Sequence, residues 1–258
     1  MFETLILSLV QGITEFLPVS SSGHLILARH LFGWKDPGMT LDIGLHVGTL
    51  LAVIIYFFKD FLHLALYSWR KKSSFSFLTN LVVATLPVAI VGFISKDRIE
   101  QNMRGAECVA ICLIFFGVAL YLADRCKGKK CMEDMTIIDA LLIGLAQCLA
   151  LIPGTSRSGI TITMGRIRGL RRSVAAKFSM MLSVPTIMGA ALLQFGSLYS
   201  EGRLNELNGL FYFGVFCSFI GGLSAIWFLM KWVQTKSFLP FVIYRIALGL
   251  WILYLLHW

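Results

Sequence analysis

Two polar stretches in an otherwise apolar chain hold the residue types that could act on a phosphate group. The first runs from Gln11 to His24 and reads QGITEFLPVSSSGH. Within it, Gln11 and Glu15 are four residues apart and would share one face of a helix. Pro18 is expected to break that helix, and the turn after it could present backbone N–H groups and hydroxyls to an anion. The hydroxyls of this turn belong to Ser20, Ser21 and Ser22.

The second stretch supplies a positive partner. It reads PGTSRSGIT from Pro153 to Thr161, and its only charged residue is Arg157. A planar guanidinium in a loop of small residues suits bidentate binding of a phosphate group. Beside the charged groups, the candidates for contact with the substrate in the two stretches are Gln11, Ser20, Ser22, Gly154, Ser156, Ser158 and Thr161.

The two stretches would be complementary if they met in space. The first offers a carboxylate, hydroxyls and an imidazole, and the second offers a cation. Together they would provide an acid, a base, a candidate nucleophile and a phosphate clamp, which are the groups needed for phosphoryl transfer to water. Glu15 could also hold a divalent cation at such a site.

The composition indicates that these groups lie in a membrane protein. Of the 258 residues, 57% are apolar and 14% are charged, and the mean hydropathy is +0.77. Soluble domains average about 25% charged residues, so a soluble globule and a disordered chain are both excluded. The net charge of +9 is then better explained by positively charged cytoplasmic loops than by binding of nucleic acid.

The apolar segments predict an all-α integral membrane protein. Six of them are close to the roughly 20 residues that a spanning helix needs: Leu41–Phe58, Phe75–Ile94, Glu107–Ala123, Val174–Phe195, Gly209–Met230 and Phe238–Trp258. Two others, Phe2–Leu17 and Ile137–Ile152, have helical arms of about 15 residues, or about 22 Å, and lead directly into the two polar stretches. Each is therefore expected to form a re-entrant helical hairpin, whose irregular backbone must be covered by protein or line a cavity.

The two hairpins are related in sequence. A shift of 136 positions brings six identical pairs into register, three of them within the polar stretches: Leu5 and Leu141, Leu9 and Leu145, Gln11 and Gln147, Ser20 and Ser156, Ser22 and Ser158, and Gly23 and Gly159. Three helices follow each hairpin, and a proline, Pro87 or Pro185, is expected to break one helix in each half. The chain is thus predicted to be one membrane domain of two repeats, about 1–123 and 136–258.

The number of membrane crossings and the distribution of positive charge predict the orientation of the chain in the membrane. Three crossings separate the hairpins, so the second repeat would be inverted relative to the first, as in several transporters. Fourteen Lys and Arg residues fall on one side of this topology and six on the other. The richer side is expected to face the cytoplasm, which puts both termini on the outer side of the membrane. Because Glu3 stands where a leader would be positive, the N-terminus is not expected to be a cleavable signal peptide.

Several polar residues have simpler structural explanations. Small and hydroxyl-bearing residues in membrane helices often serve close packing alone, which would account equally well for Ser20 and Ser158. Arg245 is expected to be structural, reaching toward the interface or pairing with an acid. The histidines without clustered partners, also expected to be structural, are His30, His46 and His63.

A cluster of arginines follows the second polar stretch. It is most simply a charge cluster facing the inside, although its spacing is also compatible with binding of lipid headgroups. Its members are Arg166, Arg168, Arg171 and Arg172.

The two polar stretches resemble the motifs of the bacterial undecaprenyl-diphosphatase family of the bacitracin-resistance type. The first family motif has Glu or Gln, Glu four residues later, and then Phe-Leu-Pro-Val-Ser-Ser-x-Gly-His, which matches Gln11 to His24. The second, Pro-Gly-x-Ser-Arg-Ser-x-x-Thr, matches Pro153 to Thr161. Two long motifs in the right order and spacing are a specific signal, and the resemblance extends over essentially the whole chain.

The resemblance implies an integral membrane enzyme that hydrolyses undecaprenyl diphosphate to undecaprenyl phosphate and inorganic phosphate. This reaction recycles the lipid carrier of peptidoglycan synthesis. The resemblance also implies dependence on Mg²⁺ or Ca²⁺, and a site that opens to the outer face of the cytoplasmic membrane.

Roles for single residues follow from the same resemblance. Glu15 would be a metal-binding or catalytic carboxylate, Ser21 a candidate nucleophile, and His24 a general base or nucleophile. Arg157 would bind the diphosphate. Gln11 stands where many family members have Glu, and since an amide cannot supply a second negative charge, Glu15 would carry more of the metal binding. The spacing leaves open whether Ser21 or a metal-bound water attacks the phosphorus.

A secondary transporter or lipid flippase is the alternative from another functional class. The expected inverted repeat fits it equally well. The two loops carry different reactive groups, which favours hydrolysis over transport alone. A combined role, with hydrolysis outside followed by return of the carrier to the inside, stays open. The oligomeric state, the preferred metal and the preferred prenyl length are not determined by the sequence.

Overall fold

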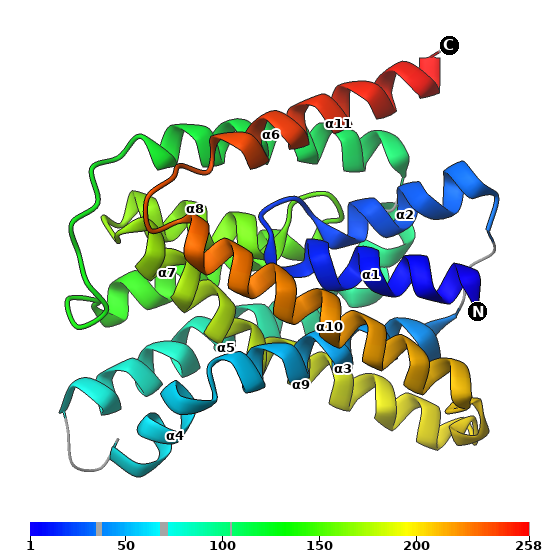
Figure 1. Ribbon diagram of the computed structural model, residues 1–258, viewed down its shortest axis with the longest axis horizontal. Helices are drawn as coiled ribbons and strands as arrows, with labels where there is room; N and C mark the ends of the chain where they lie inside the picture. Colours follow the sequence, from blue (N-terminus) through cyan, green and yellow to red (C-terminus); the bar gives the residue numbers. More distant parts are fainter. Residues whose placement is uncertain (35–37, 68–71, 104, 258) are drawn as a thin grey trace.

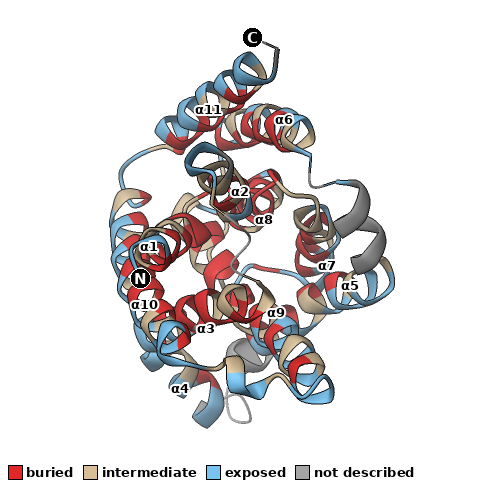
Figure 2. Cartoon of the chain, turned by 90° about the vertical axis from the view of Figure 1, so that its right-hand side faces the viewer, coloured by how far each residue is buried: buried red, intermediate tan, exposed pale blue. Residues whose placement is uncertain are grey.

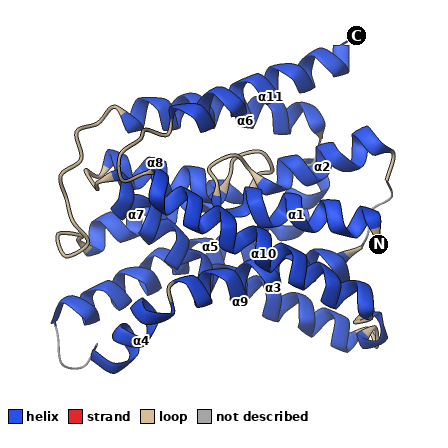
Figure 3. Ribbon diagram, viewed as in Figure 1, coloured by secondary structure: helices blue, strands red, loops and turns tan. Residues whose placement is uncertain are grey.

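The computed structural model describes residues 1–34, 38–67, 72–103 and 105–257, and the elements found in these ranges are helices (Figures 1 and 3). The one β-type contact in the described ranges is an isolated bridge between Lys130 and Leu170. Both termini lie at the right-hand end of the molecule in Figure 1. The last residue of the helix predicted at Phe238–Trp258 lies outside the described residues.

Six helices are long and apolar enough to cross a membrane, and they correspond to the six predicted spans. Their ends differ from the prediction by a few residues, most of all in α5 and α9, which extend beyond their apolar cores. The six helices are α3 (Met39–Tyr56), α5 (Lys72–Asn102), α6 (Ala106–Asp124), α9 (Arg172–Ser200), α10 (Gly209–Trp232) and α11 (Leu239–His257).

Two local predictions were wrong. The prolines do not end their helices, because α5 continues through Pro87 and α9 through Pro185. A proline removes one N–H donor and tends to bend a helix, but packing on both sides can hold the helix together. The predicted span Leu41–Phe58 instead ends at Tyr56, and a short helix that the sequence did not predict, α4 (Phe58–Tyr67), follows the turn at Phe57.

Two shorter helix pairs occupy the places of the predicted hairpins. The first pair is α1 (Phe2–Phe16) and α2 (Ser21–Phe32), and the second is α7 (Ile137–Gln147), extended by the 3-10 turn η1 (Cys148–Leu151), and α8 (Arg157–Ile167). In Figure 1, α2 runs back toward the end of the molecule at which α1 begins, and α8 runs back toward the opposite end, where α7 begins. A third short segment, the 3-10 turn η2 (Leu204–Glu206), lies between α9 and α10.

Each short pair packs against a long helix of the other half of the chain. α1 contacts α10, α7 contacts α5, α3 lies against both α10 and α9, and α6 lies against α11. In the end view of Figure 2, buried residues face inward around α2 and α8, and the outward faces are exposed. Those outward faces carry large apolar side chains such as Phe93, Phe115 and Leu192, each more than 60% exposed. Lipid tails are the solvent that such faces require, so the chain is a multi-pass membrane protein.

Candidate active site

The break between α1 and α2 places a serine at the start of a helix in a strained conformation. α1 ends at Phe16, and Leu17 is extended with φ −68° and ψ 143°. Ser20 then adopts φ 76° and ψ 96°, and its Oγ accepts a hydrogen bond from the N–H of Gly23 at 3.4 Å. A positive φ at a residue other than glycine costs free energy and is often found at functional sites. The capped turn thus fixes the position of Ser21, the first residue of α2.

The break between η1 and α8 repeats this geometry. Ser156 has φ 70° and ψ 112°, and its Oγ accepts from the N–H of Gly159 at 3.1 Å. In both breaks the capping serine also contacts the serine two residues later, with Oγ–Oγ distances of 3.3 Å for Ser20 and Ser22 and 3.2 Å for Ser156 and Ser158. In the described residues these two serines are the only non-glycine positions with positive φ.

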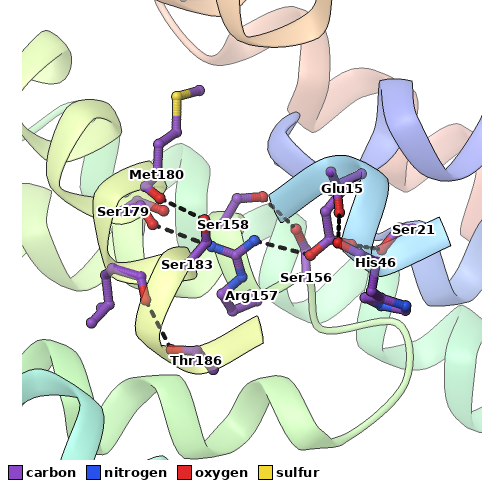
Figure 4. Close-up of polar contacts among 12 residues, drawn as sticks. Glu15, Ser21, His46, Ser156, Arg157, Ser158, Ser179, Met180, Ser183 and Thr186 are labelled. Atoms are coloured by element: carbon purple, nitrogen blue, oxygen red, sulfur yellow. Dashed lines mark hydrogen bonds and ion pairs between the residues drawn. The ribbon is translucent and has the colours of Figure 1, made fainter. Parts of the chain in front are cut away.

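Glu15 is the point at which the two breaks meet (Figure 4). Its Oε2 accepts hydrogen bonds from Ser21 Oγ at 2.5 Å and from Gln11 Nε2 at 3.0 Å. Its Oε1 accepts from Arg157 Nη2 at 2.9 Å, an ion pair between residues 142 positions apart. Both partners are largely buried, with 8% of the Glu15 side chain and 12% of the Arg157 side chain exposed.

Further contacts fix the position of Arg157 and of its loop. Arg157 Nη1 donates to the carbonyl of Ser179 in α9 at 3.2 Å. Thr161 contacts the Ser179 hydroxyl at 2.7 Å and donates to the Arg157 carbonyl at 2.8 Å. Ser158 donates across the interface to the carbonyl of Leu17 at 2.9 Å, so a second hydrogen bond joins the breaks.

Most of the expected substrate-binding hydroxyls are therefore engaged within the protein. Ser20, Ser158 and Thr161 are at most 1% exposed. Ser20 caps α2, Ser158 joins the two breaks, and Thr161 bonds within α8 and to α9. Gly154 is buried with φ +91°, and a Cβ there would lie 2.5 Å from the carbonyl oxygen of Val109, so this position requires glycine. Contact of these residues with substrate stays a prediction.

His24 lies beside Ser20 and not against Ser21. Its Nδ1 is 2.7 Å from the carbonyl oxygen of Ser20, and its Nε2 is 2.6 Å from the hydroxyl of Tyr244. Since a carbonyl only accepts, Nδ1 carries the proton in the neutral ring, and Tyr244 then donates to Nε2. Tyr244 is 46% exposed, so this imidazole is linked to the accessible surface through a phenol.

Arg245 is a residue whose role the sequence analysis did not find. It is fully buried, and the described residues show it bound to carbonyl oxygens, not reaching an interface or pairing with an acid. It donates to Pro18 in the first break at 3.5 Å and to Gly154 and Thr155 in the second at 3.0 and 2.8 Å. One guanidinium thus holds the backbones of both breaks. A charged residue within an apolar segment was the available signal, but its partners are carbonyls, which no side-chain pattern reveals.

His46 of α3 was expected to be structural, and it lies near Glu15 (Figure 4). Its Nδ1 contacts the carbonyl oxygen of Asp42 at 2.8 Å, which fixes the orientation of the ring. Tyr244 and Ser179, like His46, come from helices distant in sequence from both motifs, and their spacing gave no sign of a shared site.

Comparison with known proteins identifies the family. Residues 4–251 match the family described as bacitracin resistance protein BacA. The chain belongs to the BacA family. It is 47% identical over 252 residues to the undecaprenyl-diphosphatase of Desulforudis audaxviator, with 96% of this chain and 95% of the relative covered. It is 43% identical to the undecaprenyl-diphosphatase of Alteromonas mediterranea, with 96% of each chain covered, and 41% identical to that of Hahella chejuensis, with 96% and 95% covered.

In this BacA family member, the residues around Glu15 fit one mode of binding a divalent cation. Mg²⁺ is commonly held by one or two carboxylates together with phosphate oxygens of the substrate. The site offers the Glu15 carboxylate and the side-chain oxygen of Gln11, which is buried without a hydrogen-bond partner. In the described part of the chain no group of three or more His, Cys, Asp or Glu residues could hold a metal without such help.

The arrangement in this BacA family member has a definite chemical capacity. A hydroxyl is hydrogen-bonded to a buried carboxylate, which can accept its proton, and a guanidinium lies on the other oxygen of the same carboxylate. A candidate nucleophile and a candidate phosphate-binding group thus both contact one acid.

Proposed function

We propose that the chain is a membrane phosphatase that hydrolyses undecaprenyl diphosphate to undecaprenyl phosphate and inorganic phosphate. The observation that carries this proposal is the contact of Glu15 with both Ser21 and Arg157. The names of the relatives supply the substrate, a polyprenyl diphosphate lipid. In the cell the reaction would recycle the lipid carrier of cell-wall synthesis, in keeping with the bacitracin-resistance name of the family.

The hydrogen bond between Ser21 and Glu15 favours Ser21 as the nucleophile. Ser21 Oγ would attack the terminal phosphorus while Glu15 takes its proton, and the bond from that phosphorus to the bridging oxygen would break. Polyprenyl phosphate would leave with the electron pair of that bond. A water would then attack the phosphoserine, the bond from phosphorus to Ser21 Oγ would break, Glu15 would return its proton to that oxygen, and inorganic phosphate would be released. Direct attack by water, with Glu15 as base and Ser21 orienting it, is the second route.

Arg157 would bind the diphosphate through its fork of N–H groups. Its ion pair with Glu15 holds it in place before substrate arrives. A guanidinium has more donors than one carboxylate oxygen uses, so other N–H groups can bind the diphosphate. His24 would act after a rearrangement, since its ring nitrogens are bound to Ser20 and Tyr244. If a substrate oxygen replaced the Tyr244 hydroxyl as the partner of Nε2, this nitrogen would contact the substrate directly.

A divalent cation, Mg²⁺ or Ca²⁺, would be held by Glu15 and the side-chain oxygen of Gln11, together with oxygens of the diphosphate. Bound there, it would neutralise charge on the phosphate groups. Glu15 is the only carboxylate in this set, so we expect binding of the metal to depend on the substrate.

We further infer that α1–α2 and α7–α8 are re-entrant hairpins of an inverted repeat. The repeated caps at Ser20 and Ser156 support a common origin, and the opposite directions of the two pairs in Figure 1 support inversion. The excess of Lys and Arg at the end opposite the termini supports a cytoplasmic location for that end. The termini would then be periplasmic, and the site would open to the outer face of the inner membrane.

Cysteine labelling tests this topology. The exposed Cys126 follows α6 at the end rich in Lys and Arg, and Glu201 follows α9 at the end where the termini lie. In right-side-out vesicles, an impermeant thiol reagent should label a cysteine at Glu201→Cys and leave Cys126 unlabelled until the membrane is opened. The reverse pattern would contradict the orientation.

Phosphate release by the purified protein tests the function itself. In detergent there is no second compartment, so a pure transporter would release nothing from undecaprenyl diphosphate. We expect steady release of inorganic phosphate that Arg157→Ala abolishes, with the unfolding temperature of the variant close to that of the parent. No release by the folded parent protein with Mg²⁺ or Ca²⁺ would favour the transporter.

A further inference from the structure

A basic cavity lies at the far end of α8 from the candidate active site. Its volume is about 1050 Å³. Arg157 begins α8 and Arg166 lies near its end, nine residues or about 13 Å along the helix axis. The cavity is formed by the loop after α6, the start of α9 and the loop before α11, on the left-hand side of Figure 1. It shares no lining residue with the candidate active site.

The lining carries a large excess of positive charge. Its one carboxylate is Asp124, and six of its side chains are cationic: Arg125, Lys127, Lys129, Arg166, Arg171 and Arg172. Neutral donors complete the wall, among them Ser173 and Thr235. So many like charges around one cavity repel one another, and a bound anion would relieve that repulsion.

The floor of the cavity is a rigid network of buried groups. Arg166 donates to the backbone carbonyls of Leu170, Asp124 and Cys126, and Asp124 accepts from Arg172 Nε at 2.6 Å and from the N–H of Phe238 at 3.0 Å. The single carboxylate of the lining, Asp124, is therefore already engaged by groups of the floor. The Nε of Arg166, which is only 4% exposed, has no hydrogen-bond partner and lies 3.6 Å from Asp124.

The loop that forms the wall is held in place by its backbone. The N–H of Lys130 donates to the carbonyl of Gly169 at 2.9 Å, and the N–H of Arg171 donates to the carbonyl of Lys130 at 3.1 Å. At Gly128, a Cβ would lie 2.2 Å from the carbonyl oxygen of Leu170, so only glycine lets the loop approach this closely. The cationic residues of the loop are therefore presented from a fixed frame.

The remaining cations face outward without an acidic partner. Lys127 and Lys129 are exposed, and neither forms an ion pair with a described residue. Arg125 lies over the ring of Tyr121, 4.8 Å from its centroid. Exposed apolar residues of α6 and α11, Leu122 and Leu239, lie next to these charges and are 60% and 42% exposed. A cationic pocket bordered by lipid-facing helices has the chemistry of a lipid headgroup site.

We propose that this cavity binds a phosphate group carried by an anionic membrane lipid, at a site separate from catalysis. The guanidinium groups of the arginines would bind the phosphate oxygens, Lys127 and Lys129 would supply further positive charge, and the lipid tails would lie along α6 and α11. The cluster of arginines noted in the sequence is thus divided. Arg168 pairs with Asp139, and the other three line the cavity.

Titration with short-chain lipids tests the proposal on the purified full-length protein. Native mass spectrometry would follow binding of dioctanoyl phosphatidylglycerol, with phosphatidylcholine of the same chain length as the neutral comparison. The pocket variant is Lys127→Glu with Lys129→Glu, which leaves the floor network unchanged. The matched control is Lys59→Glu with Lys231→Glu, which makes the same change of charge at two exposed lysines outside the cavity.

We expect the affinity for phosphatidylglycerol to exceed that for phosphatidylcholine by at least about tenfold, and to fall by at least about tenfold in the pocket variant and less than about twofold in the control. An equal loss in both variants would mean that general surface charge attracts the lipid, and would overturn the proposal. Inorganic phosphate at millimolar concentration should not displace the lipid. Displacement would overturn the assignment to a lipid and identify a site for the free ion.

Discussion

The two breaks of the chain have the same backbone but different chemistry. In each, a serine with positive φ caps the next helix through a glycine three residues later, and it contacts a second serine two residues on. At the positions that differ, Ser21 in the first break corresponds to Arg157 in the second, and Glu15 corresponds to Leu151. The shared backbone geometry positions the side chains, and the proposed reactive groups are at the positions where the two breaks differ.

The surroundings of the two breaks also differ in chemistry. A shift of 136 relates Val109 to Arg245, and each side chain lies against the glycine after the capping serine. A Cβ on Gly23 would be 3.3 Å from Val109, and a Cβ on Gly159 would be 2.7 Å from Arg245. An apolar contact in one half thus corresponds, in the other, to a buried cation that binds the backbones of both breaks.

The largest expected effect comes from removing the charge that joins the two breaks. Glu15→Gln keeps the size of the side chain but cannot accept the proton of Ser21. Phosphate release should fall by at least about a hundredfold, with the unfolding temperature little changed. The matched change Leu151→Met, at the corresponding position of the other break, should cost less than about twofold. Equal losses would mean that Glu15 acts through packing alone.

The second-largest effect is expected from changing Arg245, which holds the backbones of both breaks. Arg245→Gln leaves buried carbonyls of Gly154 and Thr155 without their donor, which should lower the free energy of unfolding by about 3 kcal/mol. Phosphate release should fall by about tenfold or more, because the breaks separate. Denaturation followed by circular dichroism and the release assay would check both values. An unchanged stability would contradict the role given to Arg245.

The two buried glutamines should respond in different ways. Gln11 donates to Glu15, while its counterpart Gln147 donates to the carbonyl of Ala84 at 3.3 Å and accepts from Thr186 at 3.4 Å. Gln11→Leu should reduce phosphate release about tenfold and weaken the dependence on divalent cation. Gln147→Leu should lower the unfolding temperature with less than about a twofold change in release per folded molecule. The opposite result would overturn the assignment of a catalytic role to Gln11 and a structural role to Gln147.

The smallest expected effect is the difference in stability between alanine substitutions at the two corresponding glycines. Gly159→Ala should destabilise the protein by about 1–3 kcal/mol, since the added methyl group displaces Arg245. In Gly23→Ala the added methyl group lies no closer than 3.3 Å to Val109 and 3.4 Å to Ser20 Oγ, so the cost should stay below about 1 kcal/mol. Chemical denaturation of the two variants would measure the difference. A larger cost at Gly23 would contradict the packing described for Arg245.

The sequence predicted the parts of the molecule that depend on local composition. The six spans followed from apolar length, and the two breaks from Pro, Gly and Ser at the end of short arms. The prolines in α5 and α9 were misread, because tertiary packing decides whether a proline ends a helix or lies within it. The contact of Gln11 with Glu15 followed from their spacing of four residues, whereas the contact of Ser21 with Glu15 required the turn between α1 and α2.

The partners from other helices were not foreseeable in the same way. Arg245 binds carbonyl oxygens, and backbone oxygens have no sequence signature. Tyr244 and His46 reach the site only because α11 and α3 pack beside α2 and α1, which a single sequence does not specify. The basic cavity was visible only as a run of arginines, and its division between a floor network and unpaired cations required the fold.

A double-mutant cycle on phosphate release tests most directly whether the two breaks form one catalytic unit. The changes are Glu15→Asp and Arg157→Lys, chosen to leave measurable activity, and the rates of both single variants and of the double variant are compared with the parent. If Glu15 and Arg157 act through their shared ion pair, the double variant should lose little more than the worse single variant. Losses that multiply would show that the two residues act independently and would contradict the account.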